Sequence, residues 1–407
     1  QHIRWWPVIS CRGMVRGVGA LRGLTAELVA LTVVGAILRL HKIGEESLWN
    51  DEFASMEDAL ALGPDVLIEQ LGNARPLYYV LLRPWIEVFG TTETGMRLLS
   101  AILGIAAIPA IYYLGVRTYG RRAGFFGALL LTFSRFHVRW SQDVRMYALF
   151  ALLAILSYLA FARYLDGEER WGRGAYVGVT VLLAYTHLFA AFVIVAQNVY
   201  VALAELGDRW HRLPDGSNGW IKTQLAIGIL TLPVIVAVSH RYLSMTGGGD
   251  VVGWIPSTGL YEVVTIPAQQ VYRTYDPLLP ALIAIAIAIV VVAEILVDDS
   301  GRRWTTMWTI CLGTVTVVPF LISHVARPIL VLRYTIASLP AVALVVGRSL
   351  ENVQRSIDGR FVQRLFVLGV VVLLVPPLVT YYDEPQRTQW RETADFVESR
   401  AADGDVV

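Results

Sequence analysis

The sequence predicts an all-α protein that crosses a membrane many times. Of its 407 residues, 55% are hydrophobic and only 16% are charged, which is more apolar surface than a soluble domain of this size could bury. Apolar runs of about 17–22 residues recur along the chain, and each is long enough to cross hydrocarbon. The formal charge of +1 gives no sign of nucleic-acid binding, and two cysteines allow neither a disulfide framework nor a paired-cysteine metal site.

About eleven segments are predicted to span the membrane. In chain order they are 24–40, 95–116, 122–140, 146–164, 174–187, 188–205, 222–240, 277–297, 303–322, 332–348 and 361–381. The fifth and sixth form one apolar stretch that is broken near the sequence YTHLF. Segment 76–90 is short and contains Arg83, Pro84 and Glu87, so we expect a juxtamembrane helix at the interface rather than a span.

The distribution of arginine predicts the orientation. Four arginines before the first span place the N-terminus in the cytoplasm, and the arginine-rich short loops then fall on the same side. The transmembrane catalytic domain is predicted over 1–381 of an integral plasma-membrane protein. Its outer catalytic loop (41–94) and a glycine-containing, lid-like outer loop (241–276) would face the outside with the C-terminal segment 382–407, which we expect to be truncated.

The acidic pair Asp51 and Glu52 follows Trp49 in the first outer loop. One interpretation is structural, because Asn50 or Asp51 can cap a helix whose first turn favours acids. The other is a carboxylate held at the boundary of water and lipid as a general base. If Asp51, Glu52 and Asp143 converge, they could also hold a divalent metal, although no cofactor is clearly indicated.

Arg145 and Arg333 lie at outer ends of predicted spans, where the positive-inside bias does not favour cations. Arg145 could pair with Asp143 or a lipid headgroup. Alternatively, each arginine could grip a phosphate through its planar set of donors. His187 lies in the break at YTHLF, where it is either a packing residue or a ligand.

Acids and arginines at an outer membrane face are suited to one reaction. A sugar linked to a lipid phosphate would approach through the bilayer, a carboxylate would deprotonate an acceptor, and arginines would stabilise the leaving phosphate. A lipid-linked sugar flippase and a polysaccharide exporter or polymerase are the alternatives. A transporter would need polar groups at mid-membrane, and the centres of these spans carry almost no charge.

The chain resembles the GT-C superfamily of membrane glycosyltransferases, in particular prokaryotic family 39-like (PMT-type, RgtA/B/C/D-like) proteins. The resemblance rests on the order and spacing of SLWNDEFA, RPLYYVLLRPWIEVFG, SRFHVRWSQDVRMYALFALLA, YTHLFAAFVIVAQ, RYTIASLPAVAL and WRETADFV. It implies a GT-C fold, a polyprenyl-phosphate donor of a hexose or pentose, inversion at the anomeric carbon, and a glycan, lipid or protein acceptor at the extracytoplasmic face.

The resemblance also assigns roles to residues. The acidic motif of the first outer loop falls on Asp51 and Glu52, with Asp51 the expected base. The second outer motif falls on Asp143 and Arg145, and the arginine of a later outer segment on Arg333. Tyr147 and Tyr334, which follow these arginines, are further site candidates. Many relatives carry His-Pro before Pro-Leu-Tyr-Tyr, where this chain has Ala74 and Arg75. The role of that histidine is not carried over, and Arg75 is instead a candidate phosphate contact.

Overall fold

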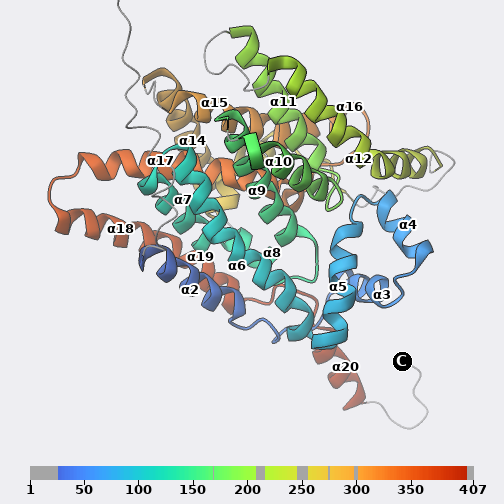
Figure 1. Cartoon of the computed structure of the whole chain (residues 1–407). Coiled ribbons are helices and arrows are strands. Elements are labelled where there is room, and N and C mark those ends of the chain that lie inside the picture. Colours follow the sequence, from blue (N-terminus) through green and yellow to red (C-terminus); the bar gives the residue numbers. More distant parts are fainter. Residues whose placement is uncertain are drawn as a thin grey trace, which may run out of the picture.

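The computed structural model of the chain describes residues 26–167, 169–207, 216–244, 255–273, 276–297 and 301–400. Within these ranges every regular element is a helix (Figure 1), which confirms the all-α prediction. The elements in chain order are α2 (Ala26–Leu40), α3 (Asn50–Leu60), α4 (Pro64–Gly72), α5 (Pro76–Phe89), α6 (Glu93–Thr118), α7 (Arg121–Phe133), α8 (Arg135–Ser141), α9 (Tyr147–Leu165), α10 (Glu169–Ala184), α11 (Ala190–Gly207), α12 (Gly216–Ser244), α13 (Leu260–Val271), α14 (Leu278–Val297), α15 (Arg302–Leu312), η2 (Gly313–Val317), α16 (Val318–Val325), η3 (Leu332–Ser338), α17 (Leu339–Ser356), α18 (Arg360–Leu374), α19 (Pro376–Asp383) and α20 (Trp390–Glu398).

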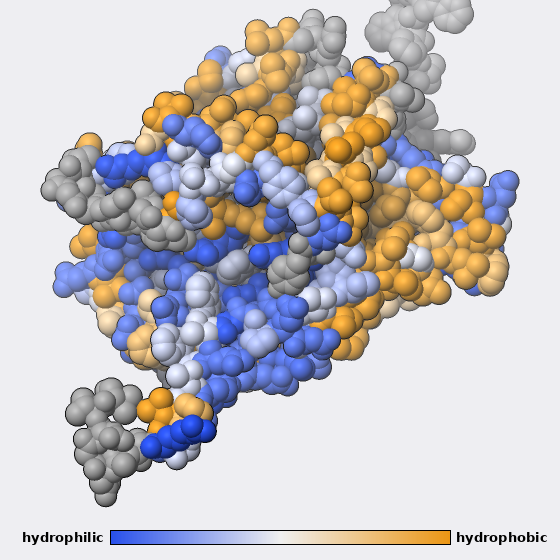
Figure 2. Space-filling model, turned by 180° about the vertical axis from the view of Figure 1, so that it is seen from behind, coloured by the Kyte–Doolittle hydropathy of each residue, from blue (hydrophilic) through white to orange (hydrophobic). Residues whose placement is uncertain are grey.

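Seven helical segments of the described chain are long and apolar enough to cross a membrane. They are Glu93–Thr118, Tyr147–Leu165, Gly216–Ser244, Leu278–Leu296, Arg302–Val325, Leu332–Ser356 and Arg360–Asp383. All seven were among the predicted spans. The predicted pair 174–187 and 188–205 forms two shorter apolar helices, α10 and α11, with the expected break at residues 185–189. Figure 2 shows hydrophobic residues over much of one face and a hydrophilic region gathered in its lower centre.

The predicted span 122–140 is two helices, α7 and α8, which meet at Ser134. The Ser134 hydroxyl accepts a hydrogen bond from the His137 N–H at 3.1 Å, as expected of a serine that caps a helix N-terminus. The break leaves carbonyl groups at the end of α7 without helical partners. Arg39 donates to two of them, at Leu131 (3.1 Å) and Thr132 (3.4 Å). The break therefore redirects the chain toward the loop that carries Asp143 and Arg145.

Glycines allow the central helices to pack closely. A Cβ added at Gly115 of α6 would lie 2.5 Å from the Gly124 Cα of α7, and one at Gly347 of α17 would lie 2.8 Å from the Gly127 N of α7. Small residues at helix crossings permit this backbone approach in membranes. The resulting bundle is a firm base for the polar loops at its end.

The predicted outer loop 41–94 contains three helices, α3, α4 and α5, which Figure 1 shows gathered on one side of the bundle. Helix α5 has 14 residues, too few to cross a bilayer, as expected for a juxtamembrane helix. The lid-like loop 241–276 differs from the prediction, because α12 continues to Ser244 and α13 forms over Leu260–Val271. Its glycine-rich part lies outside the described residues.

The C-terminal segment returns to the first outer loop. The Ser47 hydroxyl donates to the Thr388 carbonyl and accepts from the Trp390 N–H, both at 3.0 Å. Helix α20 follows, and its Arg391 forms an ion pair with Glu93 at the start of α6. This contact places the tail beside the acidic loop, an arrangement that hydropathy along the chain does not predict.

Candidate functional site

The Asp51 carboxylate, in the first turn of α3, faces two arginines from distant parts of the chain. Its Oδ2 lies 4.0 Å from the Arg145 Nη2 and 3.9 Å from the Arg333 Nη2. Arg145 also donates to the Asp51 carbonyl at 3.2 Å and to the Ser55 hydroxyl at 3.0 Å. The Asp51 side chain is 33% exposed, so the carboxylate remains accessible. The structure thus brings together the predicted base and two of the three predicted phosphate ligands, whose roles remain predictions.

A cavity of about 370 Å³ opens beside Arg145. Four arginines line it: Arg75, Arg145, Arg241 and Arg327. Among the described residues, no acidic side chain lines the cavity, although Glu69 lies 3.7 Å from Arg241 outside it. Guanidinium groups gathered in this way repel one another unless an anion lies between them. The cavity is therefore suited to a phosphate.

Aromatic side chains also line this arginine-lined cavity, among them His187, Phe189 and Tyr334, and Tyr147 packs against Tyr334. The rings of Tyr147 and Tyr334 stack with their centroids 6.2 Å apart, and the Tyr334 ring lies 4.9 Å from that of His187. The His187 Nδ1 accepts the Phe189 N–H at 3.1 Å. Burial and then the charges of Arg75, Arg145 and Arg333 lower the pKa of His187 to about 3. The neutral ring therefore carries its proton on Nε2, as a donor rather than a cation.

The backbone before α5 positions Arg75. Ala74 has φ 55°, in the left-handed region that residues with a Cβ adopt only at some cost. Arg75 then donates from Nε to the Gln70 Oε1 at 2.9 Å, and its guanidinium lies 5.9 Å from the Tyr79 ring centroid. The residues that replace the His-Pro of many relatives thus aim a cation into the cavity.

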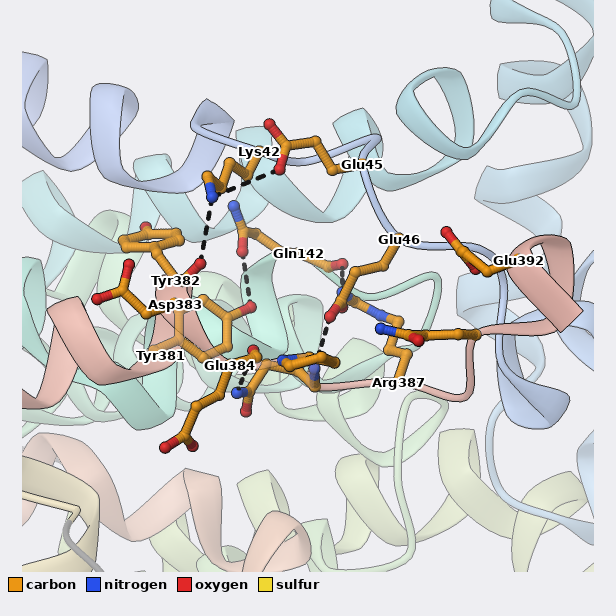
Figure 3. A pocket seen from close by; sticks show the side chains of 13 residues that line it. Lys42, Glu45, Glu46, Gln142, Tyr381, Tyr382, Asp383, Glu384, Arg387 and Glu392 are labelled. Atoms are coloured by element: carbon orange, nitrogen blue, oxygen red, sulfur yellow. Dashed lines mark hydrogen bonds and ion pairs between the residues drawn. The ribbon is translucent and has the colours of Figure 1, made fainter.

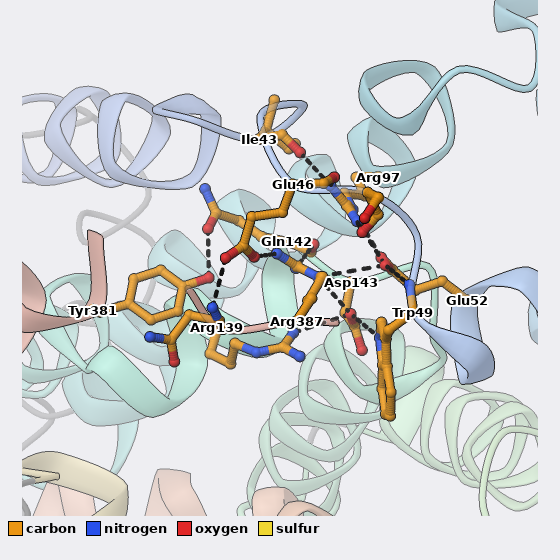
Figure 4. Close-up of polar contacts among 12 residues, drawn as sticks. Ile43, Glu46, Trp49, Glu52, Arg97, Arg139, Gln142, Asp143, Tyr381 and Arg387 are labelled. Atoms are coloured by element: carbon orange, nitrogen blue, oxygen red, sulfur yellow. Dashed lines mark hydrogen bonds and ion pairs between the residues drawn. The ribbon is translucent and has the colours of Figure 1, made fainter. Parts of the chain in front are cut away.

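Glu52, the second predicted catalytic acid, lies in a different environment (Figure 4). Its side chain is 0% exposed, and its carboxylate accepts from Arg97 at 2.6 and 2.8 Å and from the Val144 N–H at 3.0 Å. It also accepts from the Trp49 N–H at 3.4 Å. Glu52 therefore helps to cap α3, but the N-cap residue is Trp49 and not Asn50 or Asp51 as predicted. Every one of these neighbours is a donor, and Glu52 joins α3 to the loop before α9.

Arg97, near the start of α6, lies in the interior of the protein. It is fully buried and donates to the carbonyl groups of Ile43, Glu46 and Ser47 as well as to Glu52. A buried arginine needs this many acceptors because each unpaired donor is costly. Arg97 therefore shapes the loop that presents Asp51.

The carboxylate of Asp143, one of the two candidate partners of Arg145, pairs with other arginines instead. Its Oδ1 accepts the Trp49 Nε1–H at 2.9 Å and lies 3.0 Å from the Arg139 Nη1. Burial would raise the pKa of Asp143, but Arg139 and Arg387 together hold it below its usual range. Burial, followed by the charge of Asp143, raises the pKa of Glu52 against the opposing effect of Arg97 and Arg387. Arg387 was not among the predicted site residues.

Two further cavities adjoin this region. A polar cavity of about 230 Å³ lies between the first outer loop and the tail, with Gln142 and Arg387 among its lining residues (Figure 3). An apolar groove of about 870 Å³ runs between α4 and α12. The groove shares Gly72 and Arg241 with the arginine-lined cavity. An apolar path therefore leads directly to the cluster of cations.

In the part of the chain that the structure describes, no three His, Cys, Asp or Glu residues gather as a metal site. The carboxylates of Asp51 and Asp143, considered as metal ligands, have separate sets of partners. Asp51 faces Arg145 and Arg333, while Asp143 faces Trp49, Arg139 and Arg387. A cation at Asp51 would meet two guanidinium groups, so this set of residues fits a metal poorly.

Comparisons with known proteins agree with this fold. Residues 73–239 match the family model described as dolichyl-phosphate-mannose-protein mannosyltransferase. The structure is similar to that of ArnT from Cupriavidus metallidurans bound to undecaprenyl phosphate, with a TM-score of 0.57 and 13% identity over 93% of this chain and 73% of that one. No curated protein matches the chain significantly.

A second similar structure is the archaeal oligosaccharyltransferase AglB from Archaeoglobus fulgidus, in complex with an inhibitory peptide and a dolichol-phosphate. Its TM-score is 0.54, with 12% identity over 93% of this chain and 58% of that one. At such low identity these likenesses show the fold alone, and the chain spans little more than half of AglB. Together with the membrane-spanning helices, they show that this chain is an integral, multi-pass membrane protein with a GT-C type fold.

Proposed function

We propose that this protein transfers a sugar from a polyprenyl-phosphate-linked donor to an acceptor, with inversion at the anomeric carbon. The observation that carries the proposal is the position of the Asp51 carboxylate, within 4.0 Å of Arg145 and Arg333, beside a cavity lined by four arginines. A base next to a cluster of cations is the arrangement that such a transfer needs. The bound lipids named for the similar structures, undecaprenyl phosphate and a dolichol-phosphate, support a lipid phosphate as the carrier.

The donor would lie with its phosphate in the arginine-lined cavity and its isoprenoid chain in the apolar groove between α4 and α12. The groove is lined by apolar side chains of both helices, including Ile68, Leu71, Leu232 and Val236. These side chains can pack against isoprene units that enter the groove from the bilayer. Arg241, which lines both spaces, would mark the join between headgroup and chain.

In the proposed reaction, Asp51 accepts a proton from an acceptor hydroxyl or amine. The freed electron pair attacks the anomeric carbon, and the bond from this carbon to the phosphate oxygen breaks with its electrons remaining on the phosphate. Arg145 and Arg333 stabilise the charge that develops there. His187 offers its Nε2–H as a neutral donor. Glu52 stays paired with Arg97, and no step requires a metal.

We place this site at the extracytoplasmic face, because the arginine-rich short loops lie at the opposite ends of the spans. Two cysteine substitutions test the orientation in intact cells, since Thr91 and Asp358 are both exposed and lie at predicted opposite faces. An impermeant maleimide should label Thr91→Cys without permeabilisation and Asp358→Cys only after it. Labelling of Asp358→Cys alone in intact cells would place the site in the cytoplasm.

The reaction itself is tested with purified protein in lipid nanodiscs. Undecaprenyl phosphate should bind and raise the melting temperature. With membranes from a deletion strain as the source of acceptor, a panel of polyprenyl-phosphate hexoses and pentoses should show release of polyprenyl phosphate from at least one donor. Neither binding nor release with any member of the panel would refute the proposal.

A further inference from the structure

Arg387 lies beyond the last helix of the bundle, yet its side chain is only 4% exposed. Its Nη1 lies 2.6 Å from the Glu46 Oε2, and its Nη2 donates to the Gln142 carbonyl at 2.5 Å. Its Nε lies 3.4 Å from the Glu52 Oε2 and 3.5 Å from the Asp143 Oδ1. Figure 4 shows the guanidinium between these acids, which come from separate segments. The tail therefore supplies a cation that contacts both the first outer loop, which carries Glu46 and Glu52, and the loop that carries Gln142 and Asp143.

The charges of this cluster balance only when Arg387 is counted. Its three carboxylates belong to Glu46, Glu52 and Asp143, and its other cations are Arg97 and Arg139. Without Arg387, two cations would face three buried or half-buried carboxylates. An uncompensated buried charge is costly, so the loops would separate, admit water or take up a proton.

Both loops also hold the proposed reacting groups. Glu52 adjoins Asp51 on α3, and Gln142 and Asp143 precede Arg145 by three and two residues. We propose that Arg387 is a positioning residue for the transfer reaction, holding these loops together so that the Asp51 carboxylate stays against Arg145. The inference rests on the proposed function and adds a residue from the tail to it.

Arg387 is not placed to touch the donor. It lines the polar cavity of Figure 3 rather than the arginine-lined cavity next to Asp51. Its contacts are all with acids and carbonyl groups of this chain. A change at Arg387 should therefore alter the catalytic rate constant and its dependence on pH, while leaving donor binding nearly intact.

Three variants separate these effects. Arg387→Gln removes the charge, and Arg387→Lys keeps it. Arg391→Gln is the matched control, because Arg391 pairs with Glu93 at the surface of the same tail. We expect Arg387→Gln to lower kcat at pH 7 by about 10- to 100-fold, with less than about a threefold change in the donor KM. Arg387→Lys should recover most of kcat, and Arg391→Gln should match the wild type.

The acid side of the pH profile gives a readout that a loss of folded protein would not produce. The titratable and charged groups that face Glu52 and Asp143 come from several elements: Glu46, Tyr78 of α5, Arg97 of α6, Arg139 of α8, Arg145, Tyr381 of α19 and Arg387 itself. Removing one cation makes the carboxylates easier to protonate, so the acid limb of kcat should move upward by about one pH unit in Arg387→Gln. In Arg387→Lys it should stay in place.

Melting temperatures test the charge coupling without any transfer. The difference in melting temperature between the wild type and Arg387→Gln should become smaller as the pH is lowered toward 4, because protonation removes the negative charge that Arg387 no longer balances in the variant. An unchanged kcat and acid limb, a fall in kcat matched by an equal rise in donor KM, or a melting gap independent of pH would each overturn the inference. Absence of transfer and of undecaprenyl phosphate binding in the wild type would instead refute the proposed function, and the melting gap would remain measurable.

Discussion

The carboxylates of Asp51 and Glu52, adjacent in sequence, point to opposite environments. Asp51 faces Arg145 and Arg333 with a third of its side chain exposed, whereas Glu52 is enclosed by Arg97 and the Val144 N–H. Successive residues on an α-helix project about 100° apart, so the first turn of α3 can present one acid outward and bury the next. The pair therefore combines one accessible base with one internal anchor.

Asp51→Asn should lower transfer by about 10²- to 10⁴-fold, the range expected for loss of a general base. Undecaprenyl phosphate should bind at least as tightly as to the wild type, because the substitution removes a negative charge next to Arg145 and Arg333. Transfer and binding are both measured in nanodiscs. Glu45→Gln is the control, since Glu45 is a 63% exposed acid of the same loop and should have no effect. More than half of wild-type transfer in Asp51→Asn would remove Asp51 from the base role.

Arg333→Ala should raise the dissociation constant of undecaprenyl phosphate by about 10- to 100-fold, because a hydrogen bond to a charged group contributes roughly 1.5–3 kcal/mol. Arg333→Lys should recover part of this loss, since lysine keeps the charge but not the planar set of donors. Arg83→Ala on the exposed side of α5 serves as the comparison and should bind normally. Equal binding by Arg333→Ala and the wild type would contradict a phosphate contact.

His187→Gln and His187→Asn distinguish the two ring nitrogens. A glutamine amide places a donor near the Nε2 position and an asparagine amide near Nδ1, so His187→Gln should retain about tenfold more transfer than His187→Asn. Because the pKa of His187 lies near 3, the ratio of His187→Gln to wild-type activity should be flat from pH 5 to 8. A ratio that changes near pH 6 would show that a protonated His187 takes part.

Asp143→Asn should remove part of the acid sensitivity of folding. The pKa of Asp143 is lower in the folded chain than its ordinary value of 3.8. At pH values between these two pKa values, the unfolded chain therefore binds more protons than the folded chain. The contribution of Asp143 to the stability of the folded chain is complete above pH 3.8 and is lost as the pH falls through the pKa of the folded chain. The pKa of Glu52 is raised, so the contribution of Glu52 to stability changes with pH in the opposite direction. The melting temperature of the wild type should fall by about 1–2 °C more than that of Asp143→Asn between pH 5 and 3. Parallel curves would show that Asp143 is not paired in the folded protein.

Hydropathy along the chain determined the fold class and many of the element positions of this protein. A helix can cross lipid because its backbone hydrogen bonds are all made within the segment. The position of a span can therefore be predicted from the length of an apolar run alone. This is why α6, α9, α12 and α14, the break at residues 185–189 and the short α5 were all predictable. Resemblance to known motifs also brought Asp51, Arg145 and Arg333 into one hypothesis, and the structure places them together.

Tertiary structure alone decided which charged groups face each other. In the sequence, Asp143 is a candidate partner for Arg145, because sequence neighbours are the only partners visible in a linear pattern. The buried cluster instead joins Glu52 to Arg97 over 45 residues and Gln142 to Arg387 over 245. Such pairings depend on the break at Ser134 and on the return of the tail to the first outer loop. Ion pairs between distant residues produce no periodic pattern in the sequence, because the packing of the helices determines which residues come together at their ends.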